Sequence, residues 1–221
     1  MNVQNSSEKY LRSLISQGEH QELDFKFEIS DARKIARTLS AFANTDGGRL
    51  LIGVKDNGRI SGIRSEEEYY MMESAASLYC KPEVRFESVK HTIEGKHILE
   101  VYIHPVEKKP VYARDDNNRW MAYVRADDEN ILASVIQLRV WQEEQANRGS
   151  TLEFTREHRI LLGTLDHSRG MSLNKLRRDT GMRRNRLIRL LTELVIFDVV
   201  EIRLVEGESL FCLKEQPGIG D

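Results

Sequence analysis

Cysteine and proline are scarce in this chain of 221 residues, which contains two cysteines and four prolines. Because Cys80 and Cys212 stand far apart, the sequence predicts neither a disulfide framework nor a thiolate metal site. Two buried thiols in a reducing cytoplasm are the simpler interpretation.

Long hydrophobic runs are absent as well, since no apolar stretch approaches the roughly 18 residues that a membrane span needs. Residues 1–16 mix acids with bases around no apolar centre, so we expect no secretory signal peptide. These absences predict a cytoplasmic protein that has no membrane partner.

A phosphate-binding glycine loop is also missing. The chain has no Gly-x-x-x-x-Gly-Lys-Ser/Thr motif, so we expect no P-loop for ATP, and Gly47-Gly48 alone favours a turn. The formal net charge is −2, which gives no general attraction to nucleic acid. Any site for a polyanion must therefore be a local patch of basic residues.

The residues that are present fit a folded protein with two domains. Hydrophobic residues make up 40% of the chain and charged residues 31%, a composition that predicts a packed core. A polar stretch at 143–150 indicates a linker. We therefore expect a first domain at residues 1–146 and a second domain at residues 147–221.

The first domain shows both helical and strand periodicity. Helices are expected at about 7–18, 31–42, 66–79 and 131–144. Strands are expected at 21–28 and 49–55, and in two hairpins at 83–93 with 96–103 and 111–114 with 119–125. This order predicts an α+β domain with a mixed sheet.

The second domain has a different pattern, in which three helices precede two short strands. Thr155 and Ser172 can cap the first two helices, and Gly181 ends the second one. A third helix is expected at about 183–197, followed by strands at 199–205 and 209–214. This layout is typical of a small winged helix-turn-helix domain.

Several carboxylates near the start of the chain form a candidate site, with Lys26 beside them. Mg²⁺ or Mn²⁺ needs about two or three carboxylates within reach, and such a metal can activate water. A solvated strand face of alternating charges explains the same spacing and is favoured when spacing alone is considered. The candidate acids are Glu19, Glu22, Asp24 and Asp56.

The order of these residues carries more information than their spacing. The ordered segments are Glu19-His20-Gln21-Glu22-Leu23-Asp24-Phe25-Lys26, Ala41-Phe42-Ala43-Asn44-Thr45-Asp46-Gly47-Gly48 and Leu51-Ile52-Gly53-Val54-Lys55-Asp56-Asn57-Gly58. Together they resemble the Schlafen-type AlbA-like domain, and Lys109-Pro110 and Tyr123-Val124-Arg125 resemble later landmarks of that family. The resemblance extends over residues 8–145 and implies a mixed α/β fold and nucleic-acid binding.

The resemblance leaves the activity open. Some Schlafen proteins are endoribonucleases that cut structured RNA with three acids, and those positions fall on Glu19, Asp24 and Asp56. In that case the three acids would bind Mg²⁺ or Mn²⁺ and Lys26 would hold the scissile phosphate. The second acid is usually Glu in the family, so the shorter Asp24 could weaken such a site. Many bacterial relatives instead resemble DNA-binding or regulatory proteins.

A basic window in the second domain provides a second candidate site. Residues 169–189 contain eight Lys or Arg residues and one acid, Asp179. Arginine suits phosphates and guanine edges because its guanidinium is planar, and an asparagine can read adenine. The expected nucleic-acid-binding residues are Arg177, Arg178, Arg183, Arg184, Asn185, Arg186 and Arg189.

From the sequence we therefore expect a nucleic-acid-binding protein that acts in transcription regulation, with DNA as the favoured target and no certain cofactor. One alternative is a Mg²⁺- or Mn²⁺-dependent endoribonuclease. Another is an interaction module whose basic helix binds an acidic protein. A homodimer is also open, because small DNA-binding proteins often match two-fold sites.

Overall fold

The computed structural model describes residues 3–146, 151–166 and 168–215 and divides into two compact units, Met1–Leu132 and Ala133–Asp221. This division precedes the boundary expected after residue 146. The reason is that helix α4 (Val135–Gln145) packs Ile136 and Val140 into the core of the second unit. Residues 147–150 of the expected linker lie outside the described residues.

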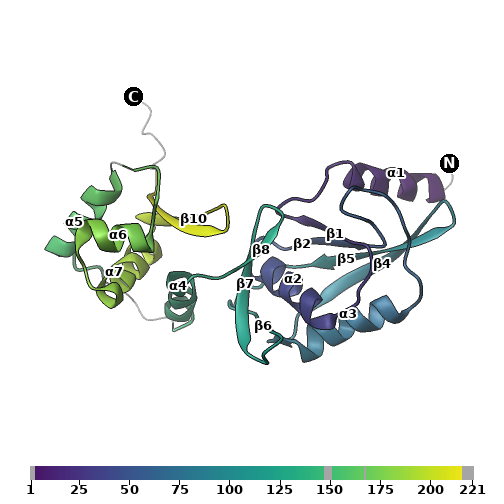
Figure 1. Ribbon diagram of the computed structural model, residues 1–221, viewed down its shortest axis with the longest axis horizontal. Coiled ribbons are helices and arrows are strands. Elements are labelled where there is room, and N and C mark those ends of the chain that lie inside the picture. The colour runs from purple at the N-terminus through teal and green to yellow at the C-terminus, as the bar shows by residue number, and fades with distance from the viewer. Residues whose placement is uncertain (1–2, 147–150, 167, 216–221) are drawn as a thin grey trace. The chain divides into compact units, whose positions relative to one another are not determined.

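The first unit contains a four-stranded mixed sheet in the order β1-β2-β5-β4 (Figure 1). Strand β1 runs parallel to β2, whereas β5 is antiparallel to both of its neighbours. A parallel pair needs a crossover, which helix α2 (Ala32–Asn44) provides, with its first turn capped by Asp31. The strands are β1 (Leu23–Lys26), β2 (Gly48–Ile52), β4 (Phe86–Ile93) and β5 (Lys96–Ile103).

A second four-stranded sheet, in the order β3-β6-β7-β8, completes the first unit. Helix α2 contacts β6 and β7 on this sheet and helix α3 (Glu67–Leu78) beside it. One apolar core therefore includes residues of α2, α3 and both sheets. The strands are β3 (Cys80–Lys81), β6 (Tyr112–Arg114), β7 (Trp120–Ala126) and β8 (Glu129–Leu132).

Helix α1 (Val3–Ile15) forms a separate small core on the β1-β2-β5-β4 sheet (Figure 1). Its Leu11 is fully buried against a cluster that includes Phe25, Leu51 and Ile98. Because side chains alternate along a strand, these residues face away from the core that contains Leu50 and Ile52. Apolar cores on both faces explain why the β2 sequence is almost continuously hydrophobic.

In the residues that the structure describes, the second unit contains four helices and a three-stranded antiparallel sheet in the order β10-β11-β9. Gly181 ends α6 with a φ of +67° and donates its N–H to the Arg177 carbonyl, as expected of a glycine at this position. After α4, the elements are α5 (Arg156–Asp166), β9 (Met171–Ser172), α6 (Leu173–Thr180), α7 (Arg184–Ile196), β10 (Val200–Val205) and β11 (Glu208–Leu213). No helix in the described part of either unit is long and apolar enough to cross a bilayer.

Candidate functional site

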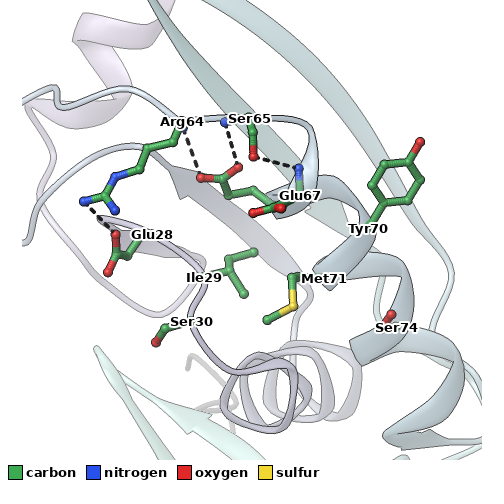
Figure 2. Close-up of a pocket in the computed structure, with 10 residues that line it drawn as sticks. Glu28, Ile29, Ser30, Arg64, Ser65, Glu67, Tyr70, Met71 and Ser74 are labelled. Carbon is green, nitrogen blue, oxygen red and sulfur yellow. Dashed lines mark hydrogen bonds and ion pairs between the residues drawn. The ribbon is translucent and has the colours of Figure 1, made fainter.

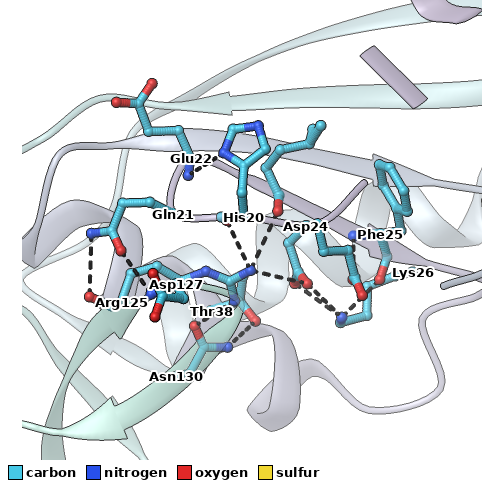
Figure 3. Close-up of polar contacts among 12 residues, drawn as sticks. His20, Gln21, Glu22, Asp24, Phe25, Lys26, Thr38, Arg125, Asp127 and Asn130 are labelled. Carbon is cyan, nitrogen blue, oxygen red and sulfur yellow. Dashed lines mark hydrogen bonds and ion pairs between the residues drawn. The ribbon is translucent and has the colours of Figure 1, made fainter. Parts of the chain in front are cut away.

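Asp24, one of the expected acids, lies on β1 beside the cations Lys26 and Arg125 (Figure 3), and Glu19 of the preceding loop interacts with it. The Asp24 side chain is buried, although a carboxylate loses much of its hydration when it leaves water. Lys26 Nζ donates to Asp24 Oδ1 at 3.1 Å and forms an ion pair with Oδ2 at 2.9 Å. Arg125 Nη2 lies 3.5 Å from Asp24 Oδ1. The negative charge of Asp24 is therefore paired with positive charges inside the fold.

Arg125 comes from β7 of the other sheet, and only 1% of its side chain is exposed. Its Nη2 also donates to the carbonyls of His20 and Leu23, each at 3.3 Å, and its Nη1 donates to Asn130 Oδ1 at 3.1 Å. The guanidinium lies over the Phe42 ring, 5.1 Å from its centroid. Arg125 thus holds the segment that carries the acids against the second sheet.

Glu19 contacts the same strand from the preceding loop. Its Oε1 accepts the Phe25 N–H at 2.9 Å. Burial and a hydrogen bond with Asp24 raise the pKa of Glu19, although the bond from Phe25 acts in the opposite direction. Glu19 therefore holds its proton more readily than an ordinary glutamate does.

The other two expected acids do not join this pair. Glu22 is exposed, and its backbone carbonyl accepts the Arg49 N–H. Asp56 lies exposed in a turn closed by the Lys55 N–H and the Arg59 carbonyl, beyond the end of β2. Within the described ranges, no three His, Cys, Asp or Glu side chains are grouped closely enough to hold a metal ion.

These residues do not fit a Mg²⁺ or Mn²⁺ ion. A hard divalent cation binds carboxylates whose charge is available, whereas Asp24 already lies beside Lys26 and Arg125. Two carboxylates and two cations leave no net negative charge to attract a third cation.

The side chains of Glu19 and Lys26 instead form hydrogen bonds with the outer edge of β1. The Glu22 and Lys26 carbonyls accept hydrogen bonds from the β2 segment, so Leu23 and Phe25 direct their backbone groups to the outside. His20 exchanges two backbone hydrogen bonds with Leu23, at 2.9 and 3.1 Å. Glu19 accepts the Phe25 N–H, and Lys26 Nζ donates to the Phe25 carbonyl at 2.7 Å. The acid-containing motif therefore closes one edge of the sheet.

The Ala-Phe-Ala-Asn-Thr segment has a similar structural role, which the sequence did not reveal. Asn44 is the last residue of α2, and its side chain is buried. It donates to the Val111 and Tyr123 carbonyls at 2.8 and 2.9 Å and accepts the Val111 N–H at 2.7 Å. Thr45 Oγ1 accepts the Arg125 N–H at 3.0 Å. The segment joins α2 to the second sheet.

The second candidate site surrounds the turn between α6 and α7. We call Arg177, Arg178, Arg183, Arg184, Asn185, Arg186 and Arg189 the basic face. Five of them, at positions 183–186 and 189, line an open hollow of about 520 Å³. All seven side chains belong to the second unit, and six are exposed, whereas Arg186 is half-buried.

The arginines of the basic face differ in their partners. Arg186 Nε donates to Glu157 of α5 at 2.7 Å, and Arg189 Nε donates to Glu193 at 2.8 Å. Arg178 lies 3.6 Å from Asp179. In the described part of the chain, Arg177, Arg183 and Arg184 have no acidic partner. The sequence could not reveal the Glu157 contact, because that acid lies on another helix.

A separate pocket of about 510 Å³ lies in the first unit (Figure 2). It is lined by the segment that follows β1, by Arg64 and Ser65, and by the first turns of α3. Arg64 pairs with Glu28 at 3.2 Å, and the buried Glu68 accepts the backbone N–H groups of Arg64 and Ser65. Its polar groups therefore bond mainly to one another, and none of the expected acids lines it.

The first unit is thus a mixed α/β domain in which Asp24 on the first strand interacts with Glu19 from the preceding loop. The family model described as "Schlafen, AlbA_2" matches residues 19–134, and the chain belongs to this family. The resemblance found in the sequence is confirmed over that range. None of the curated proteins matches the chain.

Two solved structures are similar to this chain. The crystal structure of the DIP2311 protein from Corynebacterium diphtheriae has 17% identity and a TM-score of 0.48, and the match covers 93% of this chain and 38% of that one. The solution structure of the N-terminal domain of an ATP-dependent DNA helicase RecG-related protein from Nitrosomonas europaea has 23% identity and a TM-score of 0.40, and that match covers 68% of this chain and 96% of the other.

Proposed function

We propose that this protein binds nucleic acid and acts in transcription regulation, with the basic face of the second unit docking on duplex DNA. The observation that carries the proposal is the set of exposed arginines without an acidic partner, Arg177, Arg183 and Arg184, in the described part of the chain. Unpaired cations release counterions from DNA when they neutralise phosphates, which provides most of the affinity. Membership of the Schlafen AlbA_2 family supports the same general function.

The order of elements in the second unit supports a winged helix-turn-helix interpretation. Helix α5, strand β9, helices α6 and α7, and the β10–β11 hairpin follow one another, and β9 pairs with β11. In such domains, the second helix of the helix-turn-helix enters the major groove with its N-terminal residues. Here that helix would be α7.

The start of α7 suits a phosphate group. Arg183 occupies the N-cap position, and no side chain accepts a hydrogen bond from the first turn. The helix dipole adds partial positive charge at this end, next to the guanidinium groups of Arg183 and Arg184. Asn185 follows and would be the residue available for an adenine contact.

We favour binding over metal-dependent cleavage. The nuclease alternative needs Glu19, Asp24 and Asp56 around one Mg²⁺ or Mn²⁺ ion. Asp24 is buried between two cations, and Asp56 lies in an exposed turn. The arrangement of these acids therefore supports a structural role better than a catalytic one.

The test is duplex DNA binding by fluorescence anisotropy over a salt series, with the double variant Arg183→Ala/Arg184→Ala. Loss of two phosphate contacts should weaken binding about 10- to 100-fold near 0.1 M salt and reduce the salt slope by about two. Arg85→Ala is the matched control, because Arg85 is an exposed arginine of the first unit. A chelator should not change the affinity.

Three results would contradict the proposal. The first is no DNA binding by the wild-type protein at low salt. The second is an equal affinity of the double variant and the wild type. The third is metal-dependent cutting of labelled tRNA or DNA that disappears in Asp24→Ala, which would establish the nuclease alternative instead.

A further inference from the structure

The two edges of the β1-β2-β5-β4 sheet differ in the hydrogen bonds that the rest of the chain forms with them. At the β1 edge, the outward backbone groups of Leu23 and Phe25 all have partners. At the other edge, β4 pairs with β5 over its whole length of eight residues. In the described part of the chain, no other segment or side chain forms a hydrogen bond with the β4 backbone.

Alternate residues of β4 therefore direct their N–H and C=O groups away from the sheet. Exposed edges of this kind can pair with another strand, and most proteins protect them with proline, a bulge or a covering segment. Phe86–Ile93 contains no proline or glycine, and its pairing with β5 proceeds without a break in register. The edge is therefore long and regular, and the charged side chains of Glu87 and Lys90 are what would limit its pairing with an unrelated strand.

The side chains of β4 favour pairing with a copy of itself. Val89, at the middle of the strand, is 54% exposed. In an antiparallel pair centred on Val89, Glu87 would face His91 of the other copy, and Lys90 would face Ser88. The strand carries one acid and one base, and Lys90 already has Glu66 as a partner at 2.7 Å. Registers centred on Glu87 or Lys90 would instead oppose like charges.

We propose that β4 is the contact surface for a second copy of this chain, with two β4 strands antiparallel about a two-fold axis at Val89. Such a contact satisfies the open backbone groups of both copies at once and is closed, so it makes a dimer and no larger assembly. The two sheets would join into one of eight strands. The dimer does not depend on the proposed DNA-binding function.

Sedimentation velocity of the full chain tests the proposal. The wild type should sediment as a dimer of twice 25.6 kDa at concentrations of tens of micromolar. Val89→Asp should be monomeric over the same range, because two like charges would meet at the axis. Val205→Asp is the matched control, since Val205 is an exposed valine of β10, and it should remain dimeric. Circular dichroism would verify that each variant is folded.

A cysteine at the axis tests the register. Val89→Cys should form a disulfide-linked dimer under mild oxidation, whereas Val205→Cys should not, because only facing residues come within disulfide distance. Cys80 and Cys212 are buried and do not compete. A wild type that stays monomeric overturns the proposal, as does a dimer that persists in Val89→Asp. DNA binding is measured separately, so its loss would affect only the proposed function.

Discussion

The acid cluster of the first unit and the basic face of the second unit use charge in opposite ways. Asp24 is 2% exposed and lies beside Lys26 and Arg125, so its charge is satisfied within the fold. Arg183 and Arg184 are exposed and have no acidic partner among the residues that the structure describes. The first arrangement holds two sheets together, whereas the second leaves charge available to a ligand.

The comparison shows why the same residue type can have two roles. The two groups of a buried ion pair lose their hydration when the chain folds. They then interact with each other, and little of their charge is available to a ligand. An exposed arginine keeps its hydration until a phosphate replaces the water. The presence of acids and arginines in a sequence therefore says less about binding than their pairing does.

Replacement of Arg125 by methionine should destabilise the first unit by removing one of the cations that pair with Asp24. The variant leaves Asp24 without one of its cations and leaves the His20 and Leu23 carbonyls without their donor. We expect the free energy of unfolding to fall by about 3–5 kcal/mol, the usual cost of breaking a buried ion pair. Urea unfolding followed by circular dichroism measures this loss.

Arg184→Met is the matched control for that variant. Its side chain is exposed and unpaired in the described structure, so its stability should stay within about 0.5 kcal/mol of the wild type. Equal unfolding midpoints for the two variants would show that Arg125 does not hold the sheets together.

Local elements of this fold follow from the sequence, because their causes lie within a few residues. Asp31 caps α2 at the expected start of that helix, Gly181 ends α6 as expected, and the Glu94-Gly95 turn joins β4 to β5 in the expected hairpin. Strands β3 and β9 have only two residues each and were not expected. Segments of this length form no detectable pattern without their partners.

The candidate site could be predicted only in part, because its contacts join distant segments. Arg125 meets Asp24 across 101 residues. Asp56 was expected beside Asp24, but β2 ends at Ile52, and the chain bends at Gly53, which has a φ of +98°. The acids and Lys26 were found in the sequence, whereas the contact of Arg125 with Asp24 became clear only in the structure.

Release of a paired arginine in the second unit should increase its affinity for DNA. Glu157 binds Arg186 through both Nε and Nη2. In Glu157→Gln, Arg186 becomes available and a negative charge leaves the basic face, so we expect DNA affinity to increase about 2- to 8-fold near 0.1 M salt. Glu153→Gln removes an exposed acid from the segment before α5 and serves as the control. An affinity of Glu157→Gln equal to or below that of the wild type would mean that Arg186 does not contact DNA.

The smallest expected effect concerns the raised pKa of Glu19. Burial and the hydrogen bond with Asp24 raise the pKa of Glu19 above its ordinary value of 4.5, so the folded state holds the Glu19 proton more tightly than the unfolded state does. The stability due to Glu19 is therefore present below pH 4.5 and is lost as the pH rises through the raised pKa. In Glu19→Gln this loss should disappear, and at pH 7 the variant should be as stable as the wild type or slightly more stable.

A second variant separates the proton from the hydrogen bond to β1. Glu19→Ala removes the acceptor of the Phe25 N–H, whereas the amide oxygen of glutamine can still accept that bond, so Glu19→Ala should be about 1 kcal/mol less stable than Glu19→Gln at every pH. Thermal unfolding between pH 4 and pH 7, with and without Mn²⁺, measures both effects. Mn²⁺ that stabilises the wild type but not Glu19→Gln would mean that the pair binds a metal ion, because a ligand specific to the folded state raises its stability. Equal curves with and without Mn²⁺, together with the loss of pH dependence in Glu19→Gln, would mean that these acids close the edge of a strand.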